Sequence, residues 1–487
     1  MLLGIGLFLS FAWFYQAGGW NQNTRFDLVR SLVEHGTVTI DAYVSNTGDR
    51  SRFGNHVYSD KAPGLALFAV PVAAIARPFC PADDAGYATC LSYVITLWGA
   101  ALPVAIAAVL LFWIARELGA STSGALLASV VFGLGTPAWG YATLFFGHAL
   151  AAGLLTIGWA ATIALQKDGP PERDKRLGIV LGAAFAWAAI TEYPTAPVAA
   201  LLTGLALADA WSRDRARAWR VADGLAIGVL PALLAFGAYN LAAYGSPLHI
   251  GYSNIEGFEG MQEGLMGVTA PSAAALWGIT FSSHRGLFFH SPVSLLAIAG
   301  SVLLLRTPAT RRIGALTLAV PIYYFLLNSS YYYWHGGWSF GPRHVVPALP
   351  FICLPIAWMW DRGNRAVRTG VLLAAAVSIG ITIVAVSTTP QPPLTVDHPL
   401  VEIWWPAFQR GDLSLNDQSF LEMVADTRGR KEHPRPHAAW NVGQRLGLPG
   451  LASLLPLFGA WVLLALAGRR SQADDESAVP APSSARR

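Results

Sequence analysis

Two residues of opposite charge stand where a polar stretch of the chain gives way to an apolar one. Asp60 and Lys61 are followed at once by Ala62-Pro63-Gly64 and then by an apolar run. An ammonium group at the mouth of a membrane span is costly to place, and there it suits the phosphate of a lipid-borne ligand. Asp60 would orient the lysine or serve as a second acid. The alternative is a structural lysine whose stem lies along apolar surface while its head reaches water.

An aromatic loop, residues 331–344, offers a second set of candidates. Tyr333 and Trp338 have flat faces that stack well on sugar rings, and Arg343 with His344 begins a further apolar run. A guanidinium at that position can hold a phosphate through two parallel hydrogen bonds. Aromatic residues at a membrane boundary also form interfacial belts. Their combination here with arginine and glycine favours a binding site.

Three further ionisable residues lie next to or within apolar runs. Arg285 precedes one such run, Glu192 separates two with almost no loop, and His148 lies at the start of another. An ionisable group near membrane depth is a functional candidate by default. Arg285 would supply a second phosphate contact. The plainer alternatives are an interfacial anchor for Arg285 and a histidine that only packs between helices for His148.

Residues 25–35 supply a candidate general base. Their apolar side chains recur at helical spacing, while Asp27 and Glu34 fall on the opposite, polar face. We therefore predict an amphipathic helix on the outer surface of the membrane. A carboxylate such as Asp27, held over a cavity, would take the proton of an acceptor hydroxyl. The alternative is a solvated stripe of ion pairs at i, i+3 and i, i+4.

The composition indicates the setting in which these residues work. The chain has 487 residues, of which 54% are hydrophobic and 13% charged, against about 25% charged in an ordinary soluble domain. Basic residues stand in short clusters between apolar runs, a pattern of cytoplasmic loops that argues against a nucleic-acid partner. We predict an all-α polytopic protein of the plasma (inner) membrane, surrounded by lipids, with about 11–13 transmembrane helices and juxtamembrane helices on its outer face.

The order of apolar and polar segments divides the chain into parts. Residues 1–386 form the transmembrane core, with a first outer loop at 18–61. Residues 387–445 form an extracytoplasmic loop region, 446–467 the last transmembrane helix, and 468–487 a disordered cytoplasmic tail. With the basic clusters in the cytoplasm, the polar and aromatic loops face outward, and the active site is expected there.

The number of spans depends on residues 62–115. If the loops on both sides of residues 62–78 face outward, this segment cannot cross the membrane; it would be re-entrant, or residues 88–115 would form two short spans, or Arg116 would break the charge rule. Cys80 and Cys90 could pair if their loop faces an oxidising compartment, and unpaired thiols at membrane depth are the equal alternative.

Three short motifs resemble the GT-C superfamily of polyprenyl-phosphate-dependent glycosyltransferases, above all the branch that holds protein O-mannosyltransferases and the lipid A aminoarabinose transferase. They are Arg25-Phe26, Tyr58-Ser59-Asp60-Lys61-Ala62-Pro63 at a span, and Gly341-Pro342-Arg343-His344 with Pro347 at a later span. In that family an acid usually stands just before the arginine-aromatic pair. Here Gln22-Asn23-Thr24 precede the pair, and Asp27, directly after it, is the nearest acid.

The resemblance implies a membrane glycosyltransferase that moves a sugar from a polyprenyl-phosphate donor to a glycan, lipid or protein acceptor on the extracytoplasmic face. Asp27 would be the base, and Lys61 and Arg343 would hold the phosphate. No cofactor is implied with certainty; the sequence has no Asp-x-Asp pair, so no metal ligand is assigned and a divalent metal stays open. The alternatives are a transporter or flippase of a lipid-linked sugar and a non-catalytic accessory membrane subunit.

Overall fold

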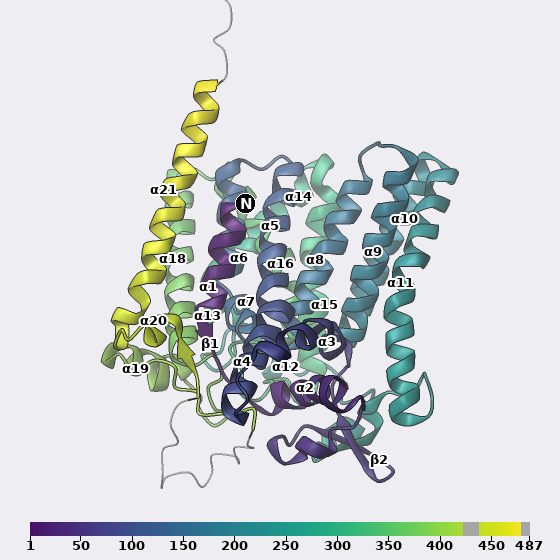
Figure 1. Cartoon of the computed structure of the whole chain (residues 1–487). Helices are drawn as coiled ribbons and strands as arrows, with labels where there is room; N and C mark the ends of the chain where they lie inside the picture. Colours follow the sequence, from purple (N-terminus) through teal and green to yellow (C-terminus); the bar gives the residue numbers. More distant parts are fainter. Residues whose placement is uncertain (422–437, 479–487) are drawn as a thin grey trace, which may run out of the picture.

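The computed structural model describes residues 1–421 and 438–478 and is built mostly of helices (Figure 1). The helices are α1 (Leu2–Ala12), α2 (Trp20–Arg30), α3 (Gly64–Ala76), α4 (Asp84–Thr96), α5 (Leu102–Glu117), α6 (Thr122–Leu134), α7 (Ala138–Ala142), α8 (Gly147–Leu165), α9 (Pro171–Thr191), α10 (Ala196–Arg213), α11 (Arg215–Tyr244), α12 (Ala273–Thr280), α13 (Leu287–His290), α14 (Leu296–Arg306), α15 (Arg311–Ser330), α16 (Leu349–Cys353), α17 (Ile356–Arg362), α18 (Arg365–Thr388), α19 (Trp405–Arg410), α20 (Val442–Arg445) and α21 (Leu455–Ala478). The prediction of an all-α fold is confirmed.

The chain is a multi-pass integral membrane protein. Among the described residues, eight helices are long and apolar enough to cross a membrane, and shorter apolar helices accompany them. The last of the eight is Gly450–Gly468, close to the predicted 446–467. The predicted tail from 468 begins inside α21, which continues to Ala478, and residues 479–487 lie outside the described part of the chain.

The structure resolves the alternatives for residues 62–115. One continuous helix runs over Asp84–Glu117, 34 residues in all, so 88–115 is a single span rather than two short ones. α3 has 13 residues and lies at the lower end of the bundle beside α2 and α4 in Figure 1. At 1.5 Å per residue it is about 20 Å long, whereas the hydrocarbon core is about 30 Å thick. α3 is therefore too short to cross.

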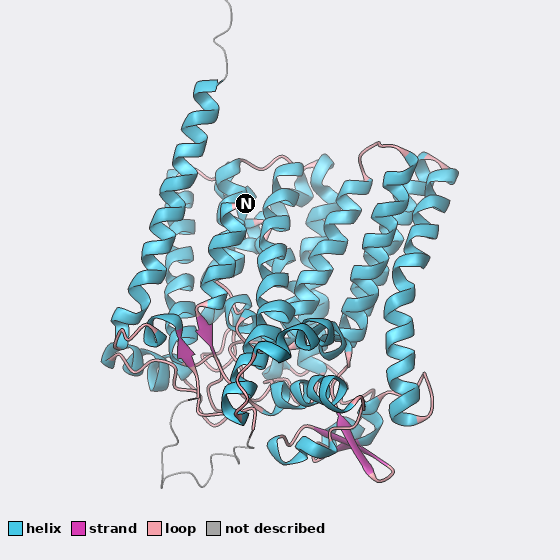
Figure 2. Ribbon diagram, viewed as in Figure 1, coloured by secondary structure: helices cyan, strands magenta, loops and turns pink. Residues whose placement is uncertain are grey.

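The polar loops and short helices gather at this same lower end, while the turns with the basic clusters, between α8 and α9 and between α10 and α11, lie at the upper end (Figure 1). Short strands are part of the lower layer (Figure 2). They are β1 (Phe14–Tyr15), β2 (Arg50–Phe53), β3 (His56–Ser59), β4 (Ile255–Glu256) and β5 (Trp440–Asn441). β1 pairs with β5, so both ends of the chain contribute to this layer.

A hairpin delivers the first candidate pair to its place. β2 and β3 are antiparallel with Phe53 opposite His56, which leaves Gly54-Asn55 as a two-residue turn. Gly54 has φ 60°, a backbone region that such turns require and that glycine adopts without strain. β3 ends at Ser59. Asp60 and Lys61 therefore follow directly at the point where the chain leaves the hairpin for α3.

Close packing of α9 on α11 positions Glu192, which follows α9. A Cβ on Gly178 would lie 2.4 Å from the carbonyl oxygen of Val221, and one on Gly228 would lie 2.2 Å from that of Ile179. Gly182 and Gly224 are equally close to the partner backbone. Glycines four residues apart on both helices let membrane helices approach to backbone contact. This contact fixes the end of α9 against the lower layer.

Candidate active site

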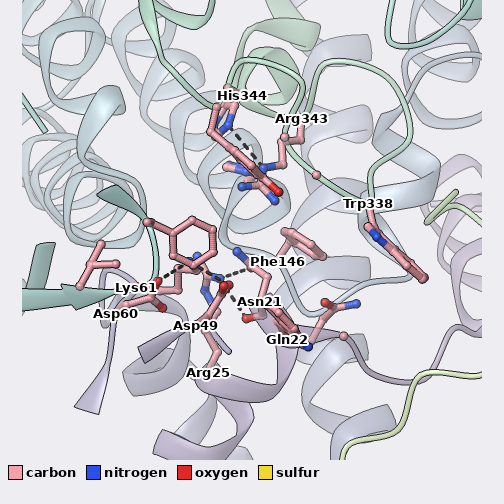
Figure 3. Close-up of a pocket in the computed structure, with 18 of the residues that line it drawn as sticks. Asn21, Gln22, Arg25, Asp49, Asp60, Lys61, Phe146, Trp338, Arg343 and His344 are labelled. Atoms are coloured by element: carbon pink, nitrogen blue, oxygen red, sulfur yellow. Dashed lines mark hydrogen bonds and ion pairs between the residues drawn. The ribbon is translucent and has the colours of Figure 1, made fainter. Parts of the chain in front are cut away.

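A cavity of about 250 Å³ opens in the lower layer and gathers most of the predicted site residues (Figure 3). Those that line it are Asp60, Lys61, His148, Glu192, Tyr333, Trp338, Arg343 and His344. They come from the hairpin exit, the start of α8, the end of α9 and the aromatic loop, and the first and last of them lie 284 residues apart in the chain. The tertiary fold therefore brings the polar loops to one site.

Lys61 lies between two carboxylates on one side of the cavity. Its Nζ is 2.6 Å from Oδ2 of Asp60 and 2.9 Å from Oδ2 of Asp49. Burial lowers the pKa of Lys61, but the charges of the two aspartates raise it more, so its net pKa lies above the usual value. Burial raises the pKa of Asp60 to about 6 against the opposing effect of Lys61. The lysine is thus held as a cation at the cavity wall.

Arg343 faces the cavity from another side. Its guanidinium lies 5.8 Å from the centre of the Phe146 ring, and its Nε is 3.4 Å from Nε2 of His344. Among the described residues it makes no salt bridge, unlike Arg25 and Lys61, the other two cations of the lining. Its charge is therefore available to an anionic ligand.

Glu192 is shared by two partners at the back of the cavity. Its Oε1 is 3.2 Å from an Nη of Arg25 and 3.3 Å from Nδ1 of His148. A Cβ on Gly147 would lie 2.3 Å from the same oxygen, so only glycine leaves room for this carboxylate. The ion pair joins α2 to the end of α9, and it neutralises Arg25 rather than leaving it for a ligand.

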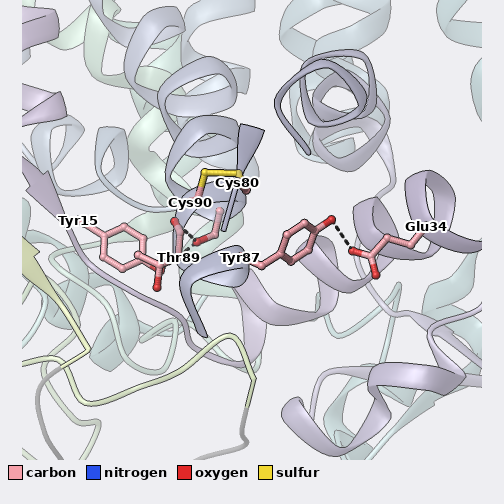
Figure 4. Close-up of a disulfide and its surroundings, with 7 residues drawn as sticks. Tyr15, Glu34, Cys80, Tyr87, Thr89 and Cys90 are labelled. Carbon is pink, nitrogen blue, oxygen red and sulfur yellow. Dashed lines mark hydrogen bonds between the residues drawn. A yellow bond between two sulfur atoms is a disulfide. The ribbon is translucent and has the colours of Figure 1, made fainter. Parts of the chain in front are cut away.

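A disulfide braces the helix that carries Arg25. Cys80 and Cys90 are bonded and join the turn after α3 to α4 (Figure 4). Tyr87 of α4 donates a 2.8 Å hydrogen bond to Glu34, which follows α2 and also accepts from Arg30 at 2.9 Å. The disulfide therefore stiffens the support on which the end of α2 rests, and the open question of pairing is answered in favour of a bond.

Two predicted site residues do not line the cavity. Asp27 is fully buried in α2, where its Oδ1 accepts a 2.8 Å hydrogen bond from Asn46. Burial raises the pKa of Asp27 well above its usual value. Arg285 is also fully buried and donates to the carbonyl oxygens of His335 and Gly337 at 3.2 and 2.8 Å. Arg285 thus holds the aromatic loop in shape instead of facing a ligand.

The helix around Asp27 differs from the prediction. It begins at Trp20, and residues 22–29 are all buried, so Asp27 lies neither on the protein surface nor over the cavity. The reason is tertiary: the side chain of Asn23 donates to the carbonyl oxygens of Asn46 and Ser419, because segments before β2 and after α19 cover this part of the helix. Further along, Arg30 and Glu34 form an i, i+4 ion pair of the kind that the alternative described. Helical periodicity identifies a polar face but does not show what packs on it.

Several lining residues were missed by the sequence reasoning. They are Asn21, Gln22, Arg25, Asp49, Gln391 and Gln418, of which Gln22 and Arg25 were noted only in the description of a motif. A signal for Asp49 does exist. Once Gly54-Asn55 is recognised as a hairpin turn, the register that pairs Arg50 with Ser59 places residue 49 opposite residue 60. The amides carry no comparable local signal.

Comparison with known proteins shows what the chain is similar to. No family model and no curated protein matches it. The fold is similar to ArnT from Cupriavidus metallidurans bound to undecaprenyl phosphate, with a TM-score of 0.46 and 18% identity over 78% of this chain and 62% of that one. It is also similar to the archaeal oligosaccharyltransferase AglB from Archaeoglobus fulgidus in complex with an inhibitory peptide and a dolichol-phosphate, with a TM-score of 0.44 and 10% identity over 88% and 60% of the two chains.

These likenesses concern the fold. At 18% and 10% identity they assign no family and no activity to this chain. It spans about three fifths of the length of the solved proteins that it matches.

Proposed function

We propose that this chain is a membrane glycosyltransferase that moves a sugar from a polyprenyl-phosphate donor to an acceptor hydroxyl. The observation that carries the proposal is the placement of two cations, Lys61 and Arg343, on two sides of one cavity, the second without a carboxylate partner among the described residues. Cations fixed at a leaving phosphate stabilise the charge that develops as the glycosidic bond breaks.

The reaction balances with groups that line the cavity. The acceptor oxygen forms a bond to the anomeric carbon, and the bond from that carbon to the phosphate oxygen breaks. The bonding pair leaves with the phosphate, between Lys61 and Arg343, while the proton of the acceptor hydroxyl passes to a carboxylate. Attack opposite to the leaving phosphate inverts the anomeric centre.

Asp49 is the carboxylate that we assign as the base. It lines the cavity and reaches Lys61 with one oxygen, Oδ2, and its second oxygen is the one that would take the proton of the acceptor hydroxyl. Asp60 is only 1% exposed and is bonded to Lys61 at its Oδ2, an arrangement suited to positioning the lysine. Glu192 already shares one oxygen between two partners. Asp27, the base suggested by the sequence, lies outside the cavity lining.

The active site would face the outside of the plasma membrane. The basic clusters lie at the end of the bundle opposite to the cavity. The positive-inside rule assigns the end with the basic clusters to the cytoplasm. The disulfide lies at the cavity end, and disulfides persist in oxidising compartments. The acceptor would therefore be a glycan, a lipid or a protein of the cell envelope. We assign no metal: among the described residues no cluster of three potential metal ligands occurs.

The test is sugar release by the purified full chain in lipid nanodiscs, with a panel of radiolabelled polyprenyl-phosphate sugars. Asp49→Asn should bind donor without releasing sugar, and Lys61→Met should lose donor binding. Arg52→Ala is the control, because this exposed arginine pairs with Glu256 and neither residue lines the cavity.

Three results separate the functions. Release by the wild type and by Arg52→Ala, but not by Asp49→Asn, supports the transferase. Saturable donor binding without release from any donor would favour the transporter or the accessory subunit, and movement of labelled lipid between leaflets would distinguish these two. No binding of any lipid phosphate refutes the transferase and the transporter and leaves the accessory subunit, which needs no lipid ligand.

A further inference from the structure

Two glutamine side chains in the cavity lining, Gln22 and Gln391, place a hydrogen-bond acceptor without a partner next to a hydrogen-bond donor. Gln22 of α2 is fully buried, and its Nε2 donates to Oε1 of Gln391 at 2.9 Å and to the carbonyl oxygen of Gly18 at 3.3 Å. These bonds use both amide protons. The Oε1 of Gln22 is buried and has no hydrogen-bond partner among the described residues. A buried amide oxygen without a partner is costly, so this atom marks a place where a ligand donor is missing.

Gln391 supplies the complementary group. Its Oε1 accepts from Gln22 and, at 3.2 Å, from Asn416, so its Nε2 is directed elsewhere. A Cβ on Gly19 would lie 2.7 Å from Oε1 of Gln22 and 2.9 Å from Nε2 of Gln391. Both atoms therefore border the same space beside Gly19, a residue that lines the cavity. A hydroxyl group can donate to the first atom and accept from the second at once.

The same side of the cavity offers an apolar face. Trp338 is partly exposed there, and Figure 3 shows it on the side of Gln22, away from the cluster of Lys61 and its aspartates. The C–H face of a pyranose ring packs on such an indole while its hydroxyls extend sideways. Neither amide carries a charge, so an ammonium or a carboxylate placed between them would lose water without gaining an ionic partner there, which is costly.

We infer that this side of the cavity binds the sugar of the donor as an uncharged pyranose, with one ring hydroxyl held between Gln22 and Gln391 and the ring face on Trp338. The inference rests on the proposed function, because the phosphate between Lys61 and Arg343 sets the ring against the amides. It narrows the donor sugar to uncharged pyranoses and excludes sugars that carry a free ammonium or a carboxylate.

The experiment measures equilibrium binding of four ligands to the full chain in nanodiscs: undecaprenyl phosphate alone, and its conjugates with a neutral hexose, an amino sugar and a uronic acid. We expect the neutral-hexose conjugate to bind about tenfold more tightly than undecaprenyl phosphate alone, because hydrogen bonds to a buried amide contribute about that much affinity. The charged sugars should give no gain. Gln22→Met should remove the gain and leave binding of the free lipid phosphate unchanged.

Two further variants keep the test decisive. Gln262→Met is the matched control, since Gln262 is exposed and outside the cavity lining, and it should retain the full gain. If the methionine variant does not fold, Gln22→Glu replaces it, because glutamate keeps the shape of the glutamine side chain. This variant should shift the binding preference to the amino sugar. Equal binding of neutral and charged sugars, or a gain that survives in both Gln22 variants, overturns the inference and leaves the phosphate site intact. A wild type that does not bind undecaprenyl phosphate overturns the proposed function and the inference together.

Discussion

Replacement of Arg343 by alanine is the sharpest test of the phosphate site. The guanidinium lines the cavity, its Nε contacts only His344 at 3.4 Å, and it has no carboxylate partner among the described residues. Its removal therefore leaves no charge unpaired inside the protein, and the fold should tolerate it. Lys61 is different, because its loss would strand two aspartates that now share its charge.

The expected loss of affinity for the lipid phosphate depends on how far the guanidinium of Arg343 is exposed to water. A hydrogen bond to a charged group contributes about 1.5–3 kcal/mol when it is shielded from water. Arg343 is only partly buried, so we take about 2 kcal/mol for its contact with phosphate, a loss of about thirtyfold in affinity. Arg343→Lys keeps the charge but not the planar fork, so about half of that energy, or about a fivefold loss, is expected.

The assay is binding of undecaprenyl phosphate to the purified variants, with the melting temperature recorded beside it. Arg52→Ala removes an exposed arginine that does not line the cavity and serves as the charge-matched control. The affinity of the control should equal that of the wild type at the same salt concentration. If Arg343→Ala melts like the wild type and binds the lipid phosphate equally well, the reasoning that makes Arg343 a phosphate ligand is refuted.

Three other predictions concern the aspartates and the disulfide. Asp49→Asn should abolish sugar release, whereas Asp27→Asn should retain it; the reverse result in activity assays would return the role of base to Asp27. Burial raises the pKa of Asp60 to about 6, above its value in the unfolded chain, so the stability that it contributes in acid should be lost as the pH rises through 6. Asp60→Asn should flatten this fall in melting temperature between pH 4 and 7, and an unchanged fall would contradict the shift. Reduction of the bond between Cys80 and Cys90 should lower the melting temperature of the wild type but not of a double serine variant; equal effects on both would show that the reductant acts elsewhere.

Some features of this protein are determined by the sequence itself because they depend on short stretches of chain. The length of an apolar run decides whether its helix can cross a membrane. Because a charge beside such a run is costly, Lys61 and Arg343 are functional candidates from the sequence alone, whatever the tertiary fold. The hairpin turn at Gly54-Asn55 is equally local, and with it the register that sets Asp49 opposite Asp60. Each of these properties can be predicted from residues close together in the chain, without knowledge of the rest of the sequence.

Other features exist only in the tertiary structure, since they depend on segments far apart in the chain. Helical spacing puts Asp27 on a polar face, but the contact of α2 with residues near Ser419 decides that this face is buried. The amide pair of Gln22 and Gln391 arises from two segments more than 360 residues apart, and no local pattern connects the two glutamines. Burial, and the unmet hydrogen bonds that it creates, is a property of what packs against a residue, so no local pattern reveals it.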